Sequence, residues 1–150
     1  MLREGDVAPD FTVADQDGSP VTLSALRGQP VVLYFYPKDD TPGCTIQACS
    51  LRDHIGELKQ RGAVVLGVSG DSVQSHRKFA DKHGLPFTLL ADTGHQIANA
   101  YGVWKHKTMF GKQVGFTERT TFVIDPEGSV KKVLPKVKPG AHVDLVLAAL

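Results

Sequence analysis

Both cysteines of this chain, Cys44 and Cys49, lie where a buried strand gives way to a helix. The apolar run 31–36 predicts a strand that is covered on both faces, and the following segment predicts a helix from about Pro42 to Arg61. A helix start presents unpaired N–H groups and the positive end of the helix dipole, and both favour a thiolate over a thiol. Because the thiolate is the nucleophilic form, Cys44 is a candidate reactive cysteine.

Length and composition limit the kind of protein that this chain forms. Its 150 residues suffice for one domain with a core, so we expect residues 1–150 to form a single domain. The net charge of +1 provides no basic field for nucleic acid or anionic lipid, and no apolar run is long enough to span a membrane. The first residues also lack the apolar core of a signal peptide. We therefore expect a cytoplasmic protein with neither a nucleic-acid nor a membrane partner.

The cysteine pair has alternative interpretations that do not involve redox catalysis. A structural disulfide would close a very short loop, and no export signal points to an oxidising compartment. Two inert buried cysteines are a second alternative, but the Thr-Pro-Gly turn at a helix start favours a reactive site. A metal site built from Cys44, Cys49 and His54 is a third, and its five-residue steps do not match the short-spaced pairs of ordinary zinc sites. We therefore expect a redox site that holds no metal.

The segment around Cys44 resembles the active-site motif of the peroxiredoxins, Pro-x-x-x-Thr-x-x-Cys. Here Pro37, Thr41 and Cys44 occupy the three named positions. The second cysteine, Cys49, is similar to that of the bacterioferritin comigratory protein subgroup, also called peroxiredoxin Q.

The resemblance to this subgroup continues at both ends of the chain. It includes residues 5–11, Gly-Asp-Val-Ala-Pro-Asp-Phe, and residues 118–125, Glu-Arg-Thr-Thr-Phe-Val-Ile-Asp. One departure is Gln47, where the subgroup more often has Glu; Gln can hydrogen-bond but adds no charge. The resemblance implies a thioredoxin-like fold of the α/β class, with a central mixed β-sheet flanked by helices.

The same resemblance implies a thiol-dependent peroxidase that reduces hydrogen peroxide and organic hydroperoxides in antioxidant defence. In such an enzyme Cys44 is the peroxidatic nucleophile and forms a sulfenic acid, and Cys49 resolves it as an intramolecular disulfide. Thioredoxin or a similar dithiol protein then reduces the disulfide. We expect no haem, flavin or metal cofactor, because the electrons come from thiols. We also expect a monomer, or at most a weakly associating dimer.

Three further residues are candidates for the active site. The hydroxyl of Thr41 can accept one hydrogen bond while it donates another. Arg119 matches the family pattern Arg-x-Thr-Phe, and its planar guanidinium suits a thiolate and a bound peroxide better than lysine does. Without the family match, Arg119 would be interpreted as a solvated residue at a strand edge. Pro37 stiffens the loop before the helix.

The spacing of the two cysteines predicts a local motion. In a regular helix the Cα atoms of Cys44 and Cys49 lie about 8.6 Å apart. A disulfide requires a Cα separation below about 7 Å. We therefore expect the first turns of this helix to unwind in each catalytic cycle.

The rest of the chain predicts alternating strands and helices. An N-terminal hairpin formed by residues 11–13 and 21–23 precedes a short helical turn capped by Ser24. This order is typical of a mixed sheet covered by helices. The other expected strands are 64–69, 87–91, 120–124 and 130–134, and the other expected helices are 72–83, 95–101 and 141–150.

Several aromatic, basic and histidine residues outside the motif are given no catalytic role. The basic run 105–107 predicts a solvated loop, and Trp104 and Phe110 either cover the rim of the active site or pack in the core. His76 and His83 share one predicted helix, and we expect both side chains to be exposed.

Two other functions remain open on the same fold. A general thiol–disulfide oxidoreductase usually has a Cys-x-x-Cys pair, which closes without unwinding a helix, and this chain lacks that pair. A redox sensor or holdase-like binding protein would use the same two cysteines. A turnover assay separates the sensor from the peroxidase.

Overall fold

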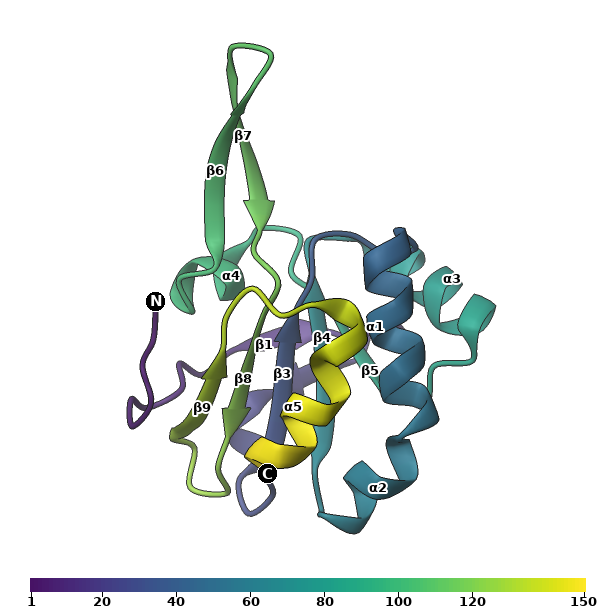
Figure 1. Ribbon diagram of the computed structural model, residues 1–150, viewed down its shortest axis with the longest axis vertical. Helices are drawn as coiled ribbons and strands as arrows, with labels where there is room; N and C mark the ends of the chain where they lie inside the picture. Colours follow the sequence, from purple (N-terminus) through teal and green to yellow (C-terminus); the bar gives the residue numbers. More distant parts are fainter.

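A five-stranded sheet with the order β5-β4-β3-β8-β9 forms the centre of the computed structural model, which describes residues 1–150 (Figure 1). In the middle lies β3 (Val31–Phe35), with β4 (Val64–Ser69) parallel to it and β5 (Thr88–Ala91) parallel to β4. On the other side β8 (Thr120–Ile124) pairs antiparallel with β3, and β9 (Val130–Leu134) pairs antiparallel with β8. The sheet is therefore mixed, as the order of predicted elements indicated.

Alternate residues of β3 build two separate cores, one on each face of the sheet. Val32 and Tyr34 belong to one core, and Val31, Leu33 and Phe35 belong to the other. Helices cover both faces, which explains why the strand is a continuous apolar run. On the face of Tyr34 lie α1 (Pro42–Asp53), α2 (Ile55–Gln60), α3 (Val73–His83) and α5 (His142–Ala149), and on the opposite face lies α4 (Gln96–Ala100).

The N-terminal hairpin is present and comprises β1 (Thr12–Ala14) and β2 (Pro20–Thr22). A 3₁₀ turn, η1 (Leu23–Leu26), follows directly. The expectation that Ser24 caps this turn was wrong, because Ser24 lies inside it. The backbone N–H of Ser24 instead donates to the carboxylate of Asp10, at 2.9 Å.

The single helix predicted from about Pro42 to Arg61 is divided into α1 and α2 by a break at His54. The ring Nδ1 of His54 lies 2.8 Å from the carbonyl oxygen of Ser50, which is the acceptor that the His54 backbone N–H would use in a regular helix. That N–H instead donates to Leu51, at 3.2 Å. The side chain therefore competes with the backbone and interrupts the helix.

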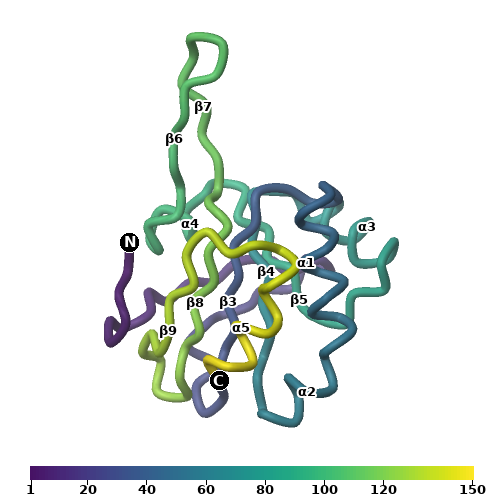
Figure 2. Tube along the Cα trace, in the orientation of Figure 1, coloured from purple at the N-terminus to yellow at the C-terminus, as the bar shows by residue number.

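A two-stranded arm projects away from the rest of the molecule (Figures 1 and 2). It consists of β6 (Trp104–Met109) and β7 (Lys112–Thr117), so the loop expected at residues 105–107 is a strand. The turn between the strands places Phe110 and Gly111 at positive φ, a conformation that suits a two-residue hairpin. Because Phe110 is 97% exposed in this turn, it does not cover the active site.

Strand direction decides which residues meet at the carboxyl end of β3. Because β8 is antiparallel to β3, its first residue Thr120 pairs with Phe35, the last residue of β3. Arg119 therefore lies beside the loop that leads from β3 into α1. No helix in the chain is both long enough and apolar enough to cross a membrane.

Candidate active site

Cys44 lies in the first turn of α1, where backbone N–H groups have no partner within the helix. Thr41 precedes the helix in an extended conformation, and Pro42 occupies its opening turn without the loss of a helical hydrogen bond. The Cys44 side chain is directed toward the sheet and joins the core that contains Tyr34. With 2% of its surface exposed, Cys44 reacts only with a molecule that enters the site.

Arg119, which directly precedes β8, connects the sheet to the start of α1. Its Nη2 donates to Sγ of Cys44 at 3.4 Å, and its Nη1 donates to Oε1 of Gln47 at 2.6 Å. The planar fork of the guanidinium therefore spans one helical turn. This contact places a permanent positive charge beside the Cys44 sulfur.

Gly43 allows the guanidinium to approach the helix so closely. A Cβ on Gly43 would lie 3.1 Å from Nη2 of Arg119 and 3.3 Å from Cγ of Pro139. Contacts of that length are tighter than side chains normally tolerate, so any larger residue would displace one of these groups. Sequence reasoning placed Gly43 in the turn at the helix start but did not predict its contact with Arg119, because no local pattern reveals a partner that is distant in the chain.

Gln47 is fully buried beneath Arg119. Its Oε1 accepts from the guanidinium, whereas its Nε2 has no hydrogen-bond partner. A glutamate here would neutralise the guanidinium, so the neutral Gln47 leaves the positive charge of Arg119 available to Cys44.

The other predicted site residues lie in the loop that leads into the helix. The Thr41 hydroxyl donates to the carbonyl oxygen of Lys38 at 2.9 Å, which leaves its lone pairs free to accept a hydrogen bond. Pro37 is exposed, and its ring restrains the backbone of the loop. Cys49 is half-buried, and both cysteines are free thiols within the intact α1.

Two residues near the site were not predicted from the sequence. Tyr34 is buried with no partner for its hydroxyl, and burial raises its pKa well above the usual value, with a further rise from nearby Cys44. His142 is also buried, with Nε2 at 2.6 Å from the hydroxyl of Thr121. Burial lowers the pKa of His142 to about 4, and the charge of Arg119 acts in the same direction. A tyrosine within the apolar run 31–36 was an available signal, whereas His142 had none.

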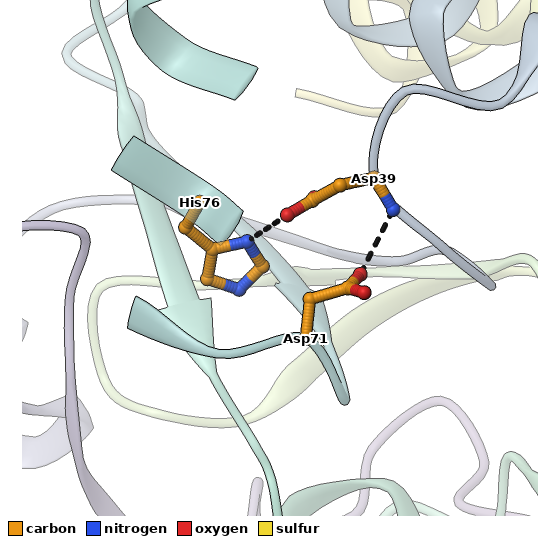
Figure 3. Close-up of side chains that lie close together, drawn as sticks. All are labelled: Asp39, Asp71 and His76. Atoms are coloured by element: carbon orange, nitrogen blue, oxygen red, sulfur yellow. Dashed lines mark hydrogen bonds and ion pairs between the residues drawn. The ribbon is translucent and has the colours of Figure 1, made fainter. Parts of the chain in front are cut away.

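Asp39, a residue of the loop before α1, forms a polar cluster with Asp71 and His76 (Figure 3). Their potential ligand atoms lie within 4.8 Å of one another, and no such group forms from Cys44, Cys49 and His54. The expectation that His76 is exposed was wrong, because His76 is fully buried. The fold turns its ring toward Asp39, a residue 37 positions earlier in the chain.

Comparison with known proteins identifies relatives over nearly the whole chain. The model of the AhpC/TSA family matches residues 5–133. Peroxiredoxin Bcp of Escherichia coli is 47% identical over 146 residues, which cover 97% of this chain and 94% of that protein. Peroxiredoxin Bcp of Bacillus subtilis is 48% identical over 149 residues, covering 99% and 95%.

Solved structures of the same subgroup share the fold. The bacterioferritin comigratory protein of Xanthomonas campestris matches with a TM-score of 0.89 and 43% identity, over 93% of this chain and 88% of that one. A mutant PrxQ from Xylella fastidiosa matches with a TM-score of 0.93 and 35% identity, over 99% and 94%. The thioredoxin-like fold implied by the sequence resemblance is therefore confirmed.

The chain belongs to the AhpC/TSA family and, within it, to the peroxiredoxins of the Bcp and peroxiredoxin Q subgroup. It is accordingly a thiol-dependent peroxidase, which confirms the enzyme class that the sequence predicted.

Substitution of Gly43 by alanine tests the contact between Arg119 and the helix start. The added methyl group displaces the guanidinium, and we expect oxidation of Cys44 by peroxide to slow by about tenfold or more, as expected for loss of a charged hydrogen bond. Gly56→Ala is a matched control, because its Cβ would have no heavy atom within 4 Å. Rapid-mixing measurements of the oxidation rate should separate the two variants, and equal slowing in both would exclude this role for Gly43.

The buried His142 predicts a component of the pH dependence of stability. Its pKa is about 4 in the folded protein and about 6.5 when exposed, so only the unfolded chain takes up this proton between those values. The free energy of unfolding should therefore decrease by up to about 3 kcal/mol as the pH falls from about 6.5 to about 4, and not further below. Urea unfolding of wild type and His142→Gln across this range should show a shallower decrease in the variant. Identical pH profiles would refute the assignment.

Proposed function

We propose that the protein reduces hydrogen peroxide and organic hydroperoxides with Cys44 as the peroxidatic cysteine and Cys49 as the resolving cysteine. The observation that carries this proposal is the 3.4 Å contact between Nη2 of Arg119 and Sγ of Cys44 at a buried helix start. A cation and unpaired N–H groups converge there on one sulfur atom, which is what a nucleophilic thiolate requires.

In the first step, the Cys44 thiolate attacks one peroxide oxygen and the O–O bond breaks. A sulfur–oxygen bond forms, and the other oxygen leaves with the electron pair and takes up a proton to become water or an alcohol. Arg119 stabilises the negative charge as it moves from sulfur to the leaving oxygen. The free lone pairs of Thr41 accept a hydrogen bond from the O–H of the hydroperoxide and orient it. Cys44 is left as a sulfenic acid.

In the second step, the thiolate of Cys49 attacks the sulfur of the Cys44 sulfenic acid. A disulfide forms, and the sulfenic oxygen leaves as water. The two cysteines lie five residues apart in one helix, with Cα atoms about 8.6 Å apart in regular geometry, beyond the reach of a disulfide. The first turns of α1 must therefore unwind for this step.

The family acts on peroxides with a thioredoxin-type reductant. We propose that such a dithiol protein supplies two electrons to the Cys44–Cys49 disulfide and regenerates both thiols. The Xanthomonas campestris relative is described by its alkyl peroxide reduction activity, which supports organic hydroperoxides as substrates here.

Several properties of the working enzyme follow from this proposal. Both cysteines of the proposed cycle lie on one chain, so a monomer suffices for turnover. We expect residues 1–150 to act as a single domain and any dimer to be weak. The electrons come from thiols, so turnover requires no resident cofactor. A reducing cytoplasm suits the cycle, because the free dithiol is the state that reacts with peroxide.

Serine substitution of each cysteine tests the assigned roles. Cys44→Ser should abolish peroxide consumption, because serine is nearly isosteric but is not ionised near neutral pH. Cys49→Ser should consume about one equivalent of peroxide and then remain a sulfenic acid, since the first step needs only Cys44. Coupled assays with thioredoxin, thioredoxin reductase and a nicotinamide donor, together with mass spectrometry, provide the readout. Normal turnover by Cys49→Ser would show that another thiol resolves Cys44.

A further inference from the structure

A buried ionic network ties the active-site loop to α3. Asp39, between β3 and α1, is only 8% exposed, and its carboxylate is directed at the first turns of α3 (Figure 3). The carboxylate accepts hydrogen bonds from the hydroxyls of Tyr36 at 2.6 Å and Ser75 at 2.8 Å. The same carboxylate lies 2.7 Å from Nδ1 of His76.

Both ring nitrogens of His76 have hydrogen-bond partners. Nε2 lies 2.8 Å from the carbonyl oxygen of Leu90, which can only accept, so Nε2 carries a proton. Nδ1 faces the Asp39 carboxylate at 2.7 Å. His76 and Asp39 therefore form a hydrogen-bonded pair in a site where neither side chain is more than 4% exposed.

The backbone of Asp39 is also held by a hydrogen bond. Its N–H donates to Oδ2 of Asp71 at 2.8 Å (Figure 3). The same Asp71 oxygen accepts from the hydroxyl of Ser69, the last residue of β4, at 2.6 Å. One residue of the loop is thus anchored to both the sheet and α3. Both carboxylate oxygens of Asp39 and both ring nitrogens of His76 have partners within the protein, which favours a structural pair over a metal site.

A second anchor to α3 lies beyond the cysteines. Nη1 of Arg52, near the end of α1, donates to the carbonyl oxygen of His83, the last residue of α3, at 2.6 Å. Asp39 and Arg52 therefore attach α1 to α3 on either side of Cys44 and Cys49. The segment between the two anchors is the one that must unwind to form the disulfide.

We propose that Asp39 and His76 are positioning residues of the peroxidase, which hold the start of α1 folded for peroxide reduction and confine unwinding to the residues between Asp39 and Arg52. This inference rests on the proposed function, in which Cys49 resolves Cys44. Loss of the Asp39–His76 pair loosens the loop, so the helix unwinds more often.

The fate of the Cys44 sulfenic acid measures how often the helix unwinds. In the unwound helix, Cys49 attacks the sulfur, and a disulfide and water form. In the folded helix, a second peroxide molecule transfers an oxygen atom to the sulfur, and a sulfinic acid and water or alcohol form. The peroxide concentration that overoxidises half of Cys44 therefore rises as unwinding becomes easier.

Neutralisation of two adjacent aspartates provides a matched comparison. Asp39→Asn removes the buried charge, and we expect the half-overoxidation concentration of peroxide to rise by about tenfold, equivalent to about 1.4 kcal/mol of lost anchoring. Asp40→Asn makes the same chemical change one residue later. Asp40 pairs only with the exposed Lys82 and the partly exposed His83, and we expect less than about a twofold change because exposed ion pairs contribute little. Mass spectrometry of Cys44 after peroxide titration under turnover gives both values.

A double substitution distinguishes the loss of this anchor from a general loss of stability. Asp39→Ala with His76→Leu removes both members of the buried pair together, a change that a protein core commonly tolerates. We expect this variant to fold and to shift overoxidation in the same direction as Asp39→Asn. Oxidation of its Cys44 by the first peroxide should also be slower, because the start of α1 is less often folded.

Each outcome of this experiment decides the proposal. Equal overoxidation in Asp39→Asn and Asp40→Asn, or a folded double variant that behaves like wild type, would overturn the anchor and leave the peroxidase assignment intact. A zinc-dependent rise in Tm that Asp39→Asn abolishes would also overturn it, because the three residues would then form a metal site. Wild-type protein that never forms a Cys44–Cys49 disulfide would overturn the proposed function as well.

Discussion

The contact between the Arg119 guanidinium and the Cys44 sulfur links the fold of this protein to its chemistry. It joins residues 75 positions apart in the sequence and exists because β8 runs antiparallel to β3 and begins where β3 ends. Gly43 leaves room for the guanidinium, and neutral Gln47 leaves its charge available. Sheet topology, the absence of a side chain at Gly43 and the neutrality of Gln47 thus combine to place a cation beside a buried sulfur atom.

The proposed catalytic cycle places two opposite demands on the first turn of α1. Peroxide reduction needs an intact first turn of α1, because that turn holds Cys44 against Arg119 and supplies its unpaired N–H groups. Disulfide formation needs that turn to open, since Cys49 lies on the same helix. In the proposed account, anchors at Asp39 and Arg52 limit this opening to one short segment, and the core strands beneath it stay packed.

How well the sequence predicted each feature depended on the range of the responsible interaction. The strand before Cys44, the N-terminal hairpin and the helix α3 follow from local patterns and were predicted correctly. The break at His54 was missed, because a single side chain competes there with the backbone. The arm formed by β6 and β7 was also missed, because its strands are mostly polar. His76 was placed on the surface, since its acceptors Asp39 and Leu90 come from other elements.

Hydrogen exchange on the reduced and disulfide forms tests the central claim most directly, namely that α1 unwinds while the sheet does not. Oxidation should remove protection from residues 43–50, because the Cys44–Cys49 disulfide cannot form in a regular helix. Protection in β3 and β4 should stay the same, since the core does not need to open. Equal protection of residues 43–50 in the two forms, or a loss of protection that extends through β3, would contradict the account.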